Sequence, residues 1–280
     1  MNSSDLYQTM RTAFLTSYPN IFTDIHYASE FFSRAVRIAV KYGFGFQPEF
    51  FEPRMCIEIE ARYKALNALI NQNLTDRTVV IEIAAGLSPR KTEFDSVPYY
   101  ELDLPPIIEI KKEIYQDMHI PCNGLIGIDL CEKEKLSDIV SGIVGREKGS
   151  GILIVSEGLF WYLKRDNISG IIEAFRHAFN QTEWNWITSD CNAKKTYEPE
   201  YRKVIGKSSN KSPNERFVDF EDERAFFSAR KLYLERYHIT DLIDIRDVYS
   251  GRFFNIPENE VRARIENYTD LARLSPNLKQ

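Results

Sequence analysis

Four short apolar segments of this 280-residue sequence end in a turn of small residues or in an acidic residue. The first ends in Glu82-Ile83-Ala84-Ala85-Gly86-Leu87, where small side chains would let backbone amides approach a ligand closely. Asp103 comes seventeen residues after Gly86, about the distance at which an acidic residue accepts hydrogen bonds from both hydroxyls of a ribose. This spacing indicates a nucleoside site. The alternative is that Asp103 is a helix N-cap before Pro105.

The two remaining segments end in Asp129 and Glu157. Asp129 lies in Gly127-Ile128-Asp129-Leu130, where its carboxylate could accept from an exocyclic amine while the amide of Leu130 donates to a ring nitrogen. The alternative is an ordinary turn aspartate. Glu157-Gly158 lies inside the apolar stretch 152–163, where burying a carboxylate is costly unless it has a cationic partner. Four segment ends therefore carry groups that could converge on one ligand.

Strands and helices alternate over the middle of the chain and would bring these ends together. The β-branched run 78–81, bounded after Ile83 by small residues, predicts a strand buried on both faces. Further strands are predicted at 99–102, 125–128, 151–156 and 184–189, and helices at 104–116 and from an N-cap at Asp166 through Phe179. Parallel neighbours need right-handed crossovers, and ligands bind beyond the carboxyl ends of their strands. The alternation predicts an α/β fold with a doubly wound, mostly parallel sheet.

The first 75 residues contain helical patterns but no convincing strand. In the clearest, apolar residues recur at spacings of four, three and four: Ile59, Tyr63, Leu66 and Ile70. We therefore expect an N-terminal helical cap. Its phenylalanines could line an apolar substrate pocket or simply form core: Phe31, Phe32, Phe44, Phe46, Phe50 and Phe51.

The chain departs from the alternation after residue 190. Residues 191–216 carry seven Lys or Arg against three Glu, which indicates a solvated loop or a mobile lid that meets an acidic substrate. A helix is predicted at 224–237 and a strand at 240–245. We expect one structural domain with four parts: the cap (1–75), the core (76–190), an insertion (191–237) and the end of the core sheet (238–280).

In this order the motifs resemble the leucine carboxyl methyltransferase family of S-adenosylmethionine-dependent O-methyltransferases, including its bacterial polyketide-type members. Ala61-Arg62 stands before the first strand as in the family, and residues 84–90 are similar to its Gly-Ala-Gly-Leu-Asp-Thr-Arg loop. Residues 100–105 are similar to the family's second-strand signature, which a lysine-containing helix follows. Gly127-Ile128-Asp129-Leu130 and the most specific motif, residues 156–163, complete the set. The resemblance covers about residues 55–180 and implies a Rossmann-like class I methyltransferase sheet.

The resemblance also implies a role for each motif residue in binding S-adenosylmethionine (SAM). The implied contacts are Arg62 with the methionine carboxylate, Gly86 with the methionine portion, Asp103 with the ribose, Asp129 and Leu130 with the adenine, and Glu157 beside the amino acid moiety, with Glu82 and Ala84 in the cofactor-binding turn. SAM carries a carboxylate, an ammonium group, a ribose diol and an adenine, and the set supplies a partner for each.

Two departures from the family pattern lie in the loop after the first strand. Ala84 replaces the first glycine, which is tolerable if its φ is negative, and Ser88-Pro89 replaces Asp-Thr. Arg90 matches the family's arginine, and could anchor an acidic substrate or tie the loop to a carboxylate. Arg62 could instead be a solvent-facing residue of an amphipathic helix.

Composition restricts the partners. Lys and Arg total 36 against 41 Asp and Glu, and the net charge of -5 argues against nucleic acid or an anionic membrane as the main partner. The absence of an 18-residue apolar run and of a signal peptide predicts a cytoplasmic protein. The four cysteines and four histidines are scattered without ligand spacing, so we expect buried reduced thiols and no metal site.

The sequence thus predicts an O-methyltransferase that converts SAM to S-adenosylhomocysteine (SAH). A carboxylate acceptor has a pKa near 4 and is already ionised at pH 7, so it needs no general base. The expected acceptor is a small organic acid or a protein C-terminus. The alternatives are a non-catalytic SAM-binding protein and a nicotinamide-dependent oxidoreductase, against which the missing third glycine of a dinucleotide fingerprint argues.

Overall fold

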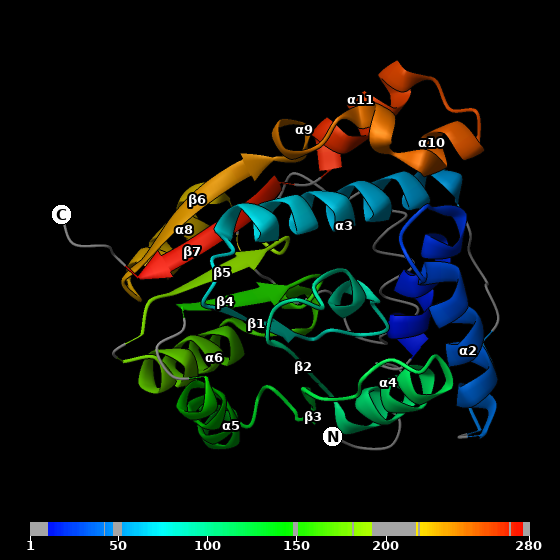
Figure 1. Cartoon of the computed structure of the whole chain (residues 1–280). Coiled ribbons are helices and arrows are strands. Elements are labelled where there is room, and N and C mark those ends of the chain that lie inside the picture. The colour runs from blue at the N-terminus through cyan, green and yellow to red at the C-terminus, as the bar shows by residue number, and fades with distance from the viewer. Residues whose placement is uncertain are drawn as a thin grey trace.

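A seven-stranded sheet with helices on both faces forms the centre of the computed structural model (Figure 1). The structure describes residues 11–41, 43–46, 52–147, 151–180, 182–191, 217, 219–268 and 270–276. The strand order is β3-β2-β1-β4-β5-β7-β6, with β7 antiparallel to both of its neighbours and the other pairs parallel. The predicted doubly wound, mostly parallel α/β sheet is confirmed.

The register of the sheet aligns the strand ends that carry the predicted site. The strands are β1 (Thr78–Ile83), β2 (Tyr99–Asp103), β3 (Leu125–Gly127), β4 (Gly151–Ser156), β5 (Trp184–Thr188), β6 (Leu232–His238) and β7 (Asp270–Pro276). Ile83 pairs with Leu102 on one side and with Ser156 on the other. Ala84, Asp103 and Glu157 each come one residue later, so all three lie at the same edge of the sheet.

Aromatic rings fill the space between the sheet and the helices on one face. These helices are α5 (Lys133–Arg146), α6 (Arg165–Ala178) and α8 (Phe220–Ser228). Phe175 is fully buried and packs edge-on against Trp186, with ring centroids 5.7 Å apart. Helix α6 begins at Arg165, so Asp166 lies in its first turn and is not the predicted N-cap.

Helix α3 (Pro53–Asn73) covers the opposite face and runs across the sheet in Figure 1. Its residues Ile57, Leu66 and Ile70 are buried in a cluster with residues of β1, β4 and β5. The segment between β6 and β7 packs against α3 and consists of α9 (Ile239–Leu242), η4 (Ile245–Asp247), α10 (Tyr249–Phe253) and α11 (Glu258–Tyr268).

The N-terminal elements η1 (Tyr18–Phe22) and α2 (Ala28–Lys41) pack with α4 (Pro105–Asp117) in a third apolar cluster. Phe31, Phe32 and Phe44 are buried there, and Phe46 is half-buried against the same cluster. These four phenylalanines are therefore core residues. Phe50 and Phe51 lie outside the described residues.

The predictions for the chain after β5 are partly wrong. The helix expected at 224–237 ends at Ser228, and Leu232–His238 is instead β6. Lys231 has a φ of +55°, which a helix does not allow, and β6 then pairs with β7 over its whole length. The strand expected at 240–245 is the short helix α9 followed by the start of η4. Of the expected basic segment, only Cys191 is described.

Further expectations concern cysteines and metal ligands. Cys56 and Cys191 are buried, Cys122 is half-buried, and Cys131 is exposed, so the prediction of buried thiols is wrong for Cys131. The described residues contain no group of three or more His, Cys, Asp or Glu that could hold a metal ion. No helix in this part of the chain is long and apolar enough to cross a membrane.

We predict that Phe175→Ala lowers the free energy of unfolding by about 3–5 kcal/mol, because it opens a cavity between α6 and β5. Phe253→Ala is the matched control, since Phe253 is half-exposed and its truncation should cost about 0.5 kcal/mol. Urea unfolding monitored by circular dichroism measures both. Equal losses would contradict this description of the core.

Candidate functional site

The turn after β1 has left-handed backbone conformations at two positions. Ala84 has a φ of +54° and Gly86 a φ of +50°. The condition under which alanine would be tolerated at position 84, a negative φ, is therefore not met: the backbone takes a glycine-like conformation, which costs an alanine about 1–2 kcal/mol. A Cβ built on Gly86 would meet nothing within 4 Å, so the turn leaves open space beside this residue.

Asp103 joins this turn to the end of β2. One carboxylate oxygen accepts a hydrogen bond from the amide of Gly86 and the other from the amide of Leu104, both at 2.6 Å. Burial raises the pKa of the Asp103 carboxyl, while the two amide hydrogen bonds oppose that rise. Because Leu104 is the N-cap of α4, the N-cap alternative for Asp103 is wrong. Each oxygen retains a lone pair that a ligand hydroxyl can use.

Arg90, at the start of η2 (Arg90–Glu93), is fully buried beneath the turn. Its Nε donates to Asn67 Oδ1 at 2.7 Å, and its two terminal nitrogens pair with Glu82 and, at 2.6 Å, with Glu157. Its guanidinium carbon lies 4.4 Å from the ring centroid of Tyr63. Burial alone would lower the pKa of Arg90, but the two carboxylates raise it well above its usual range.

The contacts of Arg90 distinguish its two possible roles, as an anchor for an acidic substrate or as a tie between the loop and a carboxylate. All three guanidinium nitrogens have protein partners, and the side chain has 0% exposure. A substrate therefore has no access to Arg90 in this structure. The role as a candidate substrate anchor is unsupported, and the contacts fit the alternative, in which Arg90 ties the loop to carboxylates.

Glu157 connects Arg90 to Arg62, which projects from α3. Arg62 Nε donates to Glu157 Oε1 at 2.7 Å. The side chains of Arg62 and Glu157 are 13% and 16% exposed, whereas those of Arg90 and Glu82 are 0% and 2% exposed, so this pair forms the accessible end of the network. Arg62 is nevertheless mostly buried, so the alternative that it is a solvent-facing residue is wrong. Burial would raise the pKa of Glu157, but the charges of Arg62 and Arg90 outweigh it and lower that pKa. Glu157 therefore has two cationic partners, Arg62 and Arg90, where the sequence required at least one.

Glu82 lies at the buried end of the network and does not reach the accessible pair. Its side chain is 2% exposed, pairs with Arg90 and accepts a hydrogen bond from the Tyr99 hydroxyl at 2.9 Å. Burial raises the pKa of this carboxyl. Glu82 therefore supports the site from beneath, and its position does not support direct contact with a cofactor.

The end of β3 lies beside Asp103. The amide of Ile128 donates to the backbone oxygen of Asp103 at 2.7 Å, and a Cβ on Gly127 would lie 3.0 Å from Pro105 Cα. Asp129 is half-buried, and one of its carboxylate oxygens accepts from the Cys131 amide at 3.0 Å. Leu130 is buried. The structure therefore places Asp129 next to Asp103 along the same edge.

Sequence reasoning missed two residues of α3 that complete the network. Tyr63 lies under Arg90 and donates to Glu93 at 2.7 Å, and Asn67 donates to the other oxygen of Glu93 at 2.9 Å while accepting from Arg90. We interpreted Tyr63 only as part of an apolar helix face. The signal that could have found them is the four-residue spacing of Tyr63 and Asn67, which places both on one face of α3.

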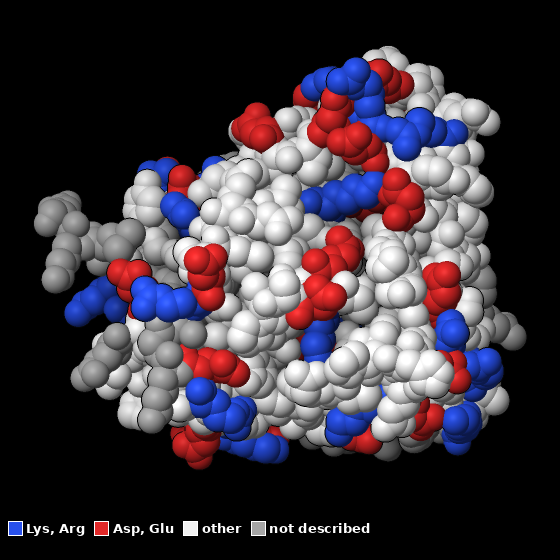
Figure 2. Space-filling view, viewed as in Figure 1, with Lys and Arg blue, Asp and Glu red and all other residues white. Residues whose placement is uncertain are grey.

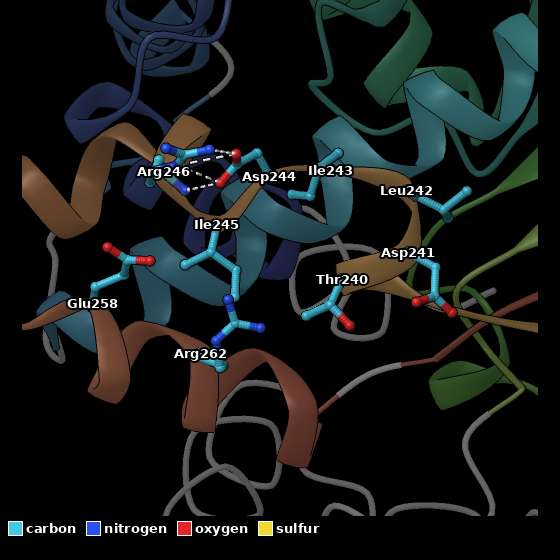
Figure 3. Close-up of a pocket in the computed structure, with 9 residues that line it drawn as sticks. All are labelled: Thr240, Asp241, Leu242, Ile243, Asp244, Ile245, Arg246, Glu258 and Arg262. Atoms are coloured by element: carbon cyan, nitrogen blue, oxygen red, sulfur yellow. Dashed lines mark hydrogen bonds and ion pairs between the residues drawn. The ribbon is translucent and has the colours of Figure 1, made fainter.

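The rest of the described surface offers less specific features. Figure 2 shows basic and acidic side chains interspersed over the face seen in Figure 1. A hollow of about 530 Å³, drawn in Figure 3, is lined by residues of the segment that connects β6 to β7. Its Arg246 pairs with Asp244, and its Arg262 with Glu266. None of the predicted site residues lines this hollow.

Solved structures with a similar arrangement share the fold. A DUF574 family protein of Streptomyces avermitilis MA-4680 matches with a TM-score of 0.56 and 12% identity, over 95% of this chain and 97% of that chain. A protein of Thermobifida fusca YX, provisionally assigned as a methyltransferase, has a TM-score of 0.53 and 11% identity, over 94% and 95% of the two chains. The chain thus has a Rossmann-like methyltransferase fold.

Other comparisons are less complete. LepI in complex with SAM matches with a TM-score of 0.41 and 9% identity. The match covers 76% of this chain but only 46% of the LepI chain. The sequence matches no protein-family model and no curated protein.

We predict that Ala84→Gly raises the free energy of unfolding by about 0.5–1 kcal/mol, because relief of the left-handed strain exceeds the extra chain entropy of glycine. Ala85→Gly is the matched control, because Ala85 has no positive φ and should lose about 0.5–1 kcal/mol. Chemical denaturation distinguishes the two. Destabilisation of similar size in both variants would contradict the turn geometry.

A second prediction concerns Glu157 and pH. Because its pKa is lower in the folded protein than the ordinary value of 4.5, its ion pairs stabilise the fold above about pH 4.5, and this stability is lost as the pH falls through the folded pKa. Glu157→Gln should therefore cost about 2 kcal/mol at pH 7. The difference from the wild type should shrink below pH 4.5. Urea titrations at several pH values measure it, and a pH-independent difference would refute the assignment.

Proposed function

We propose that this chain is a SAM-dependent methyltransferase that binds SAM at the carboxyl edge of β1 to β4. The observation that carries the proposal is the carboxylate of Asp103, held by the amides of Gly86 and Leu104 beside an open glycine turn. A carboxylate fixed in this way can accept both hydroxyls of a ribose. The fold shared with the two nearly full-length structural neighbours supports the same class of protein.

The other groups of SAM also find partners along this edge. The accessible Arg62–Glu157 pair offers a guanidinium for a carboxylate and a carboxylate for an ammonium group. Asp129 and the amide of Leu130, beside Asp103, suit the exocyclic amine and a ring nitrogen of adenine. The space beside Gly86 would take the portion between the ribose and the amino acid. The residues present therefore fit the cofactor.

Bound there, SAM would supply a methyl group on a positively charged sulfur. The protein's own contribution is to hold the reactants in line and to exclude water. Arg62, Glu157 and Asp103 would fix the two ends of the cofactor. Arg90, buried beneath them, keeps Glu157 ionised and in place together with Arg62, and Glu82 pairs with another nitrogen of Arg90.

We propose an oxygen acceptor, and specifically a carboxylate. The described network around Glu157 consists of arginines, carboxylates, a tyrosine and an amide, and it contains no histidine, the side chain whose ordinary pKa lies nearest to 7. A carboxylate is already ionised at pH 7 and needs none. The resemblance to leucine carboxyl methyltransferases supports this choice. The substrate would be a small organic acid or the C-terminus of a protein.

We predict that SAM and SAH stabilise the wild-type protein and that NAD does not. At a hundred times the dissociation constant a ligand adds about 2.7 kcal/mol, which corresponds to several degrees in the melting temperature. Asp103→Ala should abolish this shift. Asp95→Ala, which removes an exposed carboxylate, should retain it. A folded wild-type protein that responds to neither adenosyl ligand would refute the cofactor assignment.

The acceptor class is tested with methyl-labelled SAM and a panel of acids, phenols, alcohols and amines. We expect label only on carboxylates, with release of methanol on mild base treatment, because methyl esters hydrolyse readily. Methylation confined to nitrogen or carbon would refute the oxygen acceptor. Saturable SAM binding without turnover on any acceptor would instead support a non-catalytic binding protein.

A further inference from the structure

A second buried ion pair lies under the proposed cofactor turn and is not part of the network around Arg90. Lys111 of α4 and Glu101 of β2 are both fully buried, with Lys111 Nζ 2.6 Å from Glu101 Oε1. The Tyr115 hydroxyl donates to the other oxygen of Glu101 at 2.8 Å. A lysine on the apolar face of a helix is costly to bury, so its position calls for an explanation beyond helix packing.

The ammonium group of Lys111 also reaches the turn. Its Nζ donates to the backbone oxygen of Ala85 at 3.3 Å, and Ala85 lies between the two left-handed residues Ala84 and Gly86. The amide of Ala85 donates to Leu102 at 3.4 Å. With the hydrogen bond from Gly86 to Asp103, three contacts from β2 and α4 hold this turn, and Lys111 supplies the only side-chain donor among them. Strained backbone persists only where its surroundings fix it.

We propose that Lys111 is a positioning residue for the cofactor turn, and that Glu101 is buried to hold it there. The carbonyl of Ala85 accepts from the Ser88 amide inside the turn at 3.2 Å, and Lys111 is its second donor, which ties the turn to α4 and so helps direct the amide of Gly86 toward Asp103. Its positive charge also favours the carboxylate form of Asp103, against the opposing charge of Glu101. The inference rests on the proposed function in one respect: the ligand that this turn would receive is the adenosyl part of SAM.

The test separates this role from simple packing. Lys111→Met alone leaves Glu101 buried without its counter-ion and should lower the melting temperature, whereas the double variant Lys111→Met/Glu101→Gln removes both charges and should recover much of the loss. If Lys111 positions the turn, the double variant should still bind SAH at least tenfold more weakly than the wild type, measured by calorimetry. Amide exchange of Gly86, followed by NMR without ligand, should also be at least tenfold faster.

The matched control is Arg236→Met/Glu223→Gln. This pair joins β6 to α8, and Glu223 is fully buried, but none of the cofactor-turn contacts involves it. It should change neither SAH affinity nor the exchange of Gly86. A Lys111/Glu101 double variant with wild-type SAH affinity and wild-type Gly86 exchange would overturn the inference. If the wild type binds no SAH but Gly86 exchange still accelerates, the proposed cofactor fails while the positioning role stands.

Discussion

A guanidinium group without access to water requires negative charge around it, and Arg90 imposes this requirement at the centre of the protein. Its partners come from three separate elements: Asn67 on α3, Glu82 on β1 and Glu157 after β4. Removal of one partner of such a pair costs about 3–5 kcal/mol, because the remaining charge stays buried. The parallel register of β1 and β4 must be correct for Arg90 to be neutralised, and the position of α3 must be correct for its third nitrogen to be hydrogen-bonded. The same contacts leave Arg62 and Glu157 at the more exposed end, where we propose that the zwitterionic group of the ligand binds.

The turn after β1 depends on its surroundings in a similar way. Ala84 has a left-handed conformation that is unfavourable for alanine, so hydrogen bonds made by the neighbouring residues must hold the turn in place. Asp103 fixes the amide of Gly86, and Lys111 fixes the carbonyl of Ala85. The turn is therefore formed before any ligand arrives, which reduces the ordering that a ligand must impose on binding. Under the proposed function, fold stability and ligand recognition would thus draw on the same few buried charges.

The sequence predicted the parts of the structure that have local signals. The first five strands are apolar or β-branched runs bounded by small or acidic residues, and parallel topology alone brings Asp103, Asp129 and Glu157 to one edge. The pairing of Arg90 with Glu157 could not be predicted, because an ion pair between residues 67 positions apart leaves no local pattern. The positive φ of Ala84 could not be predicted from the residue type, because alanine ordinarily avoids positive values. Strand β6 was missed because its pairing with β7, more than thirty residues away, overrides a helical pattern.

The central claim is that the turn after β1 and Asp103 form the nucleoside end of a SAM site. A crystal structure of the protein grown with SAH tests it most directly. We expect both ribose hydroxyls within hydrogen-bond distance of the Asp103 carboxylate, the adenine beside Asp129, and the SAH carboxylate against Arg62. SAH bound elsewhere on the molecule, or bound at this edge without contact to Asp103, would contradict it.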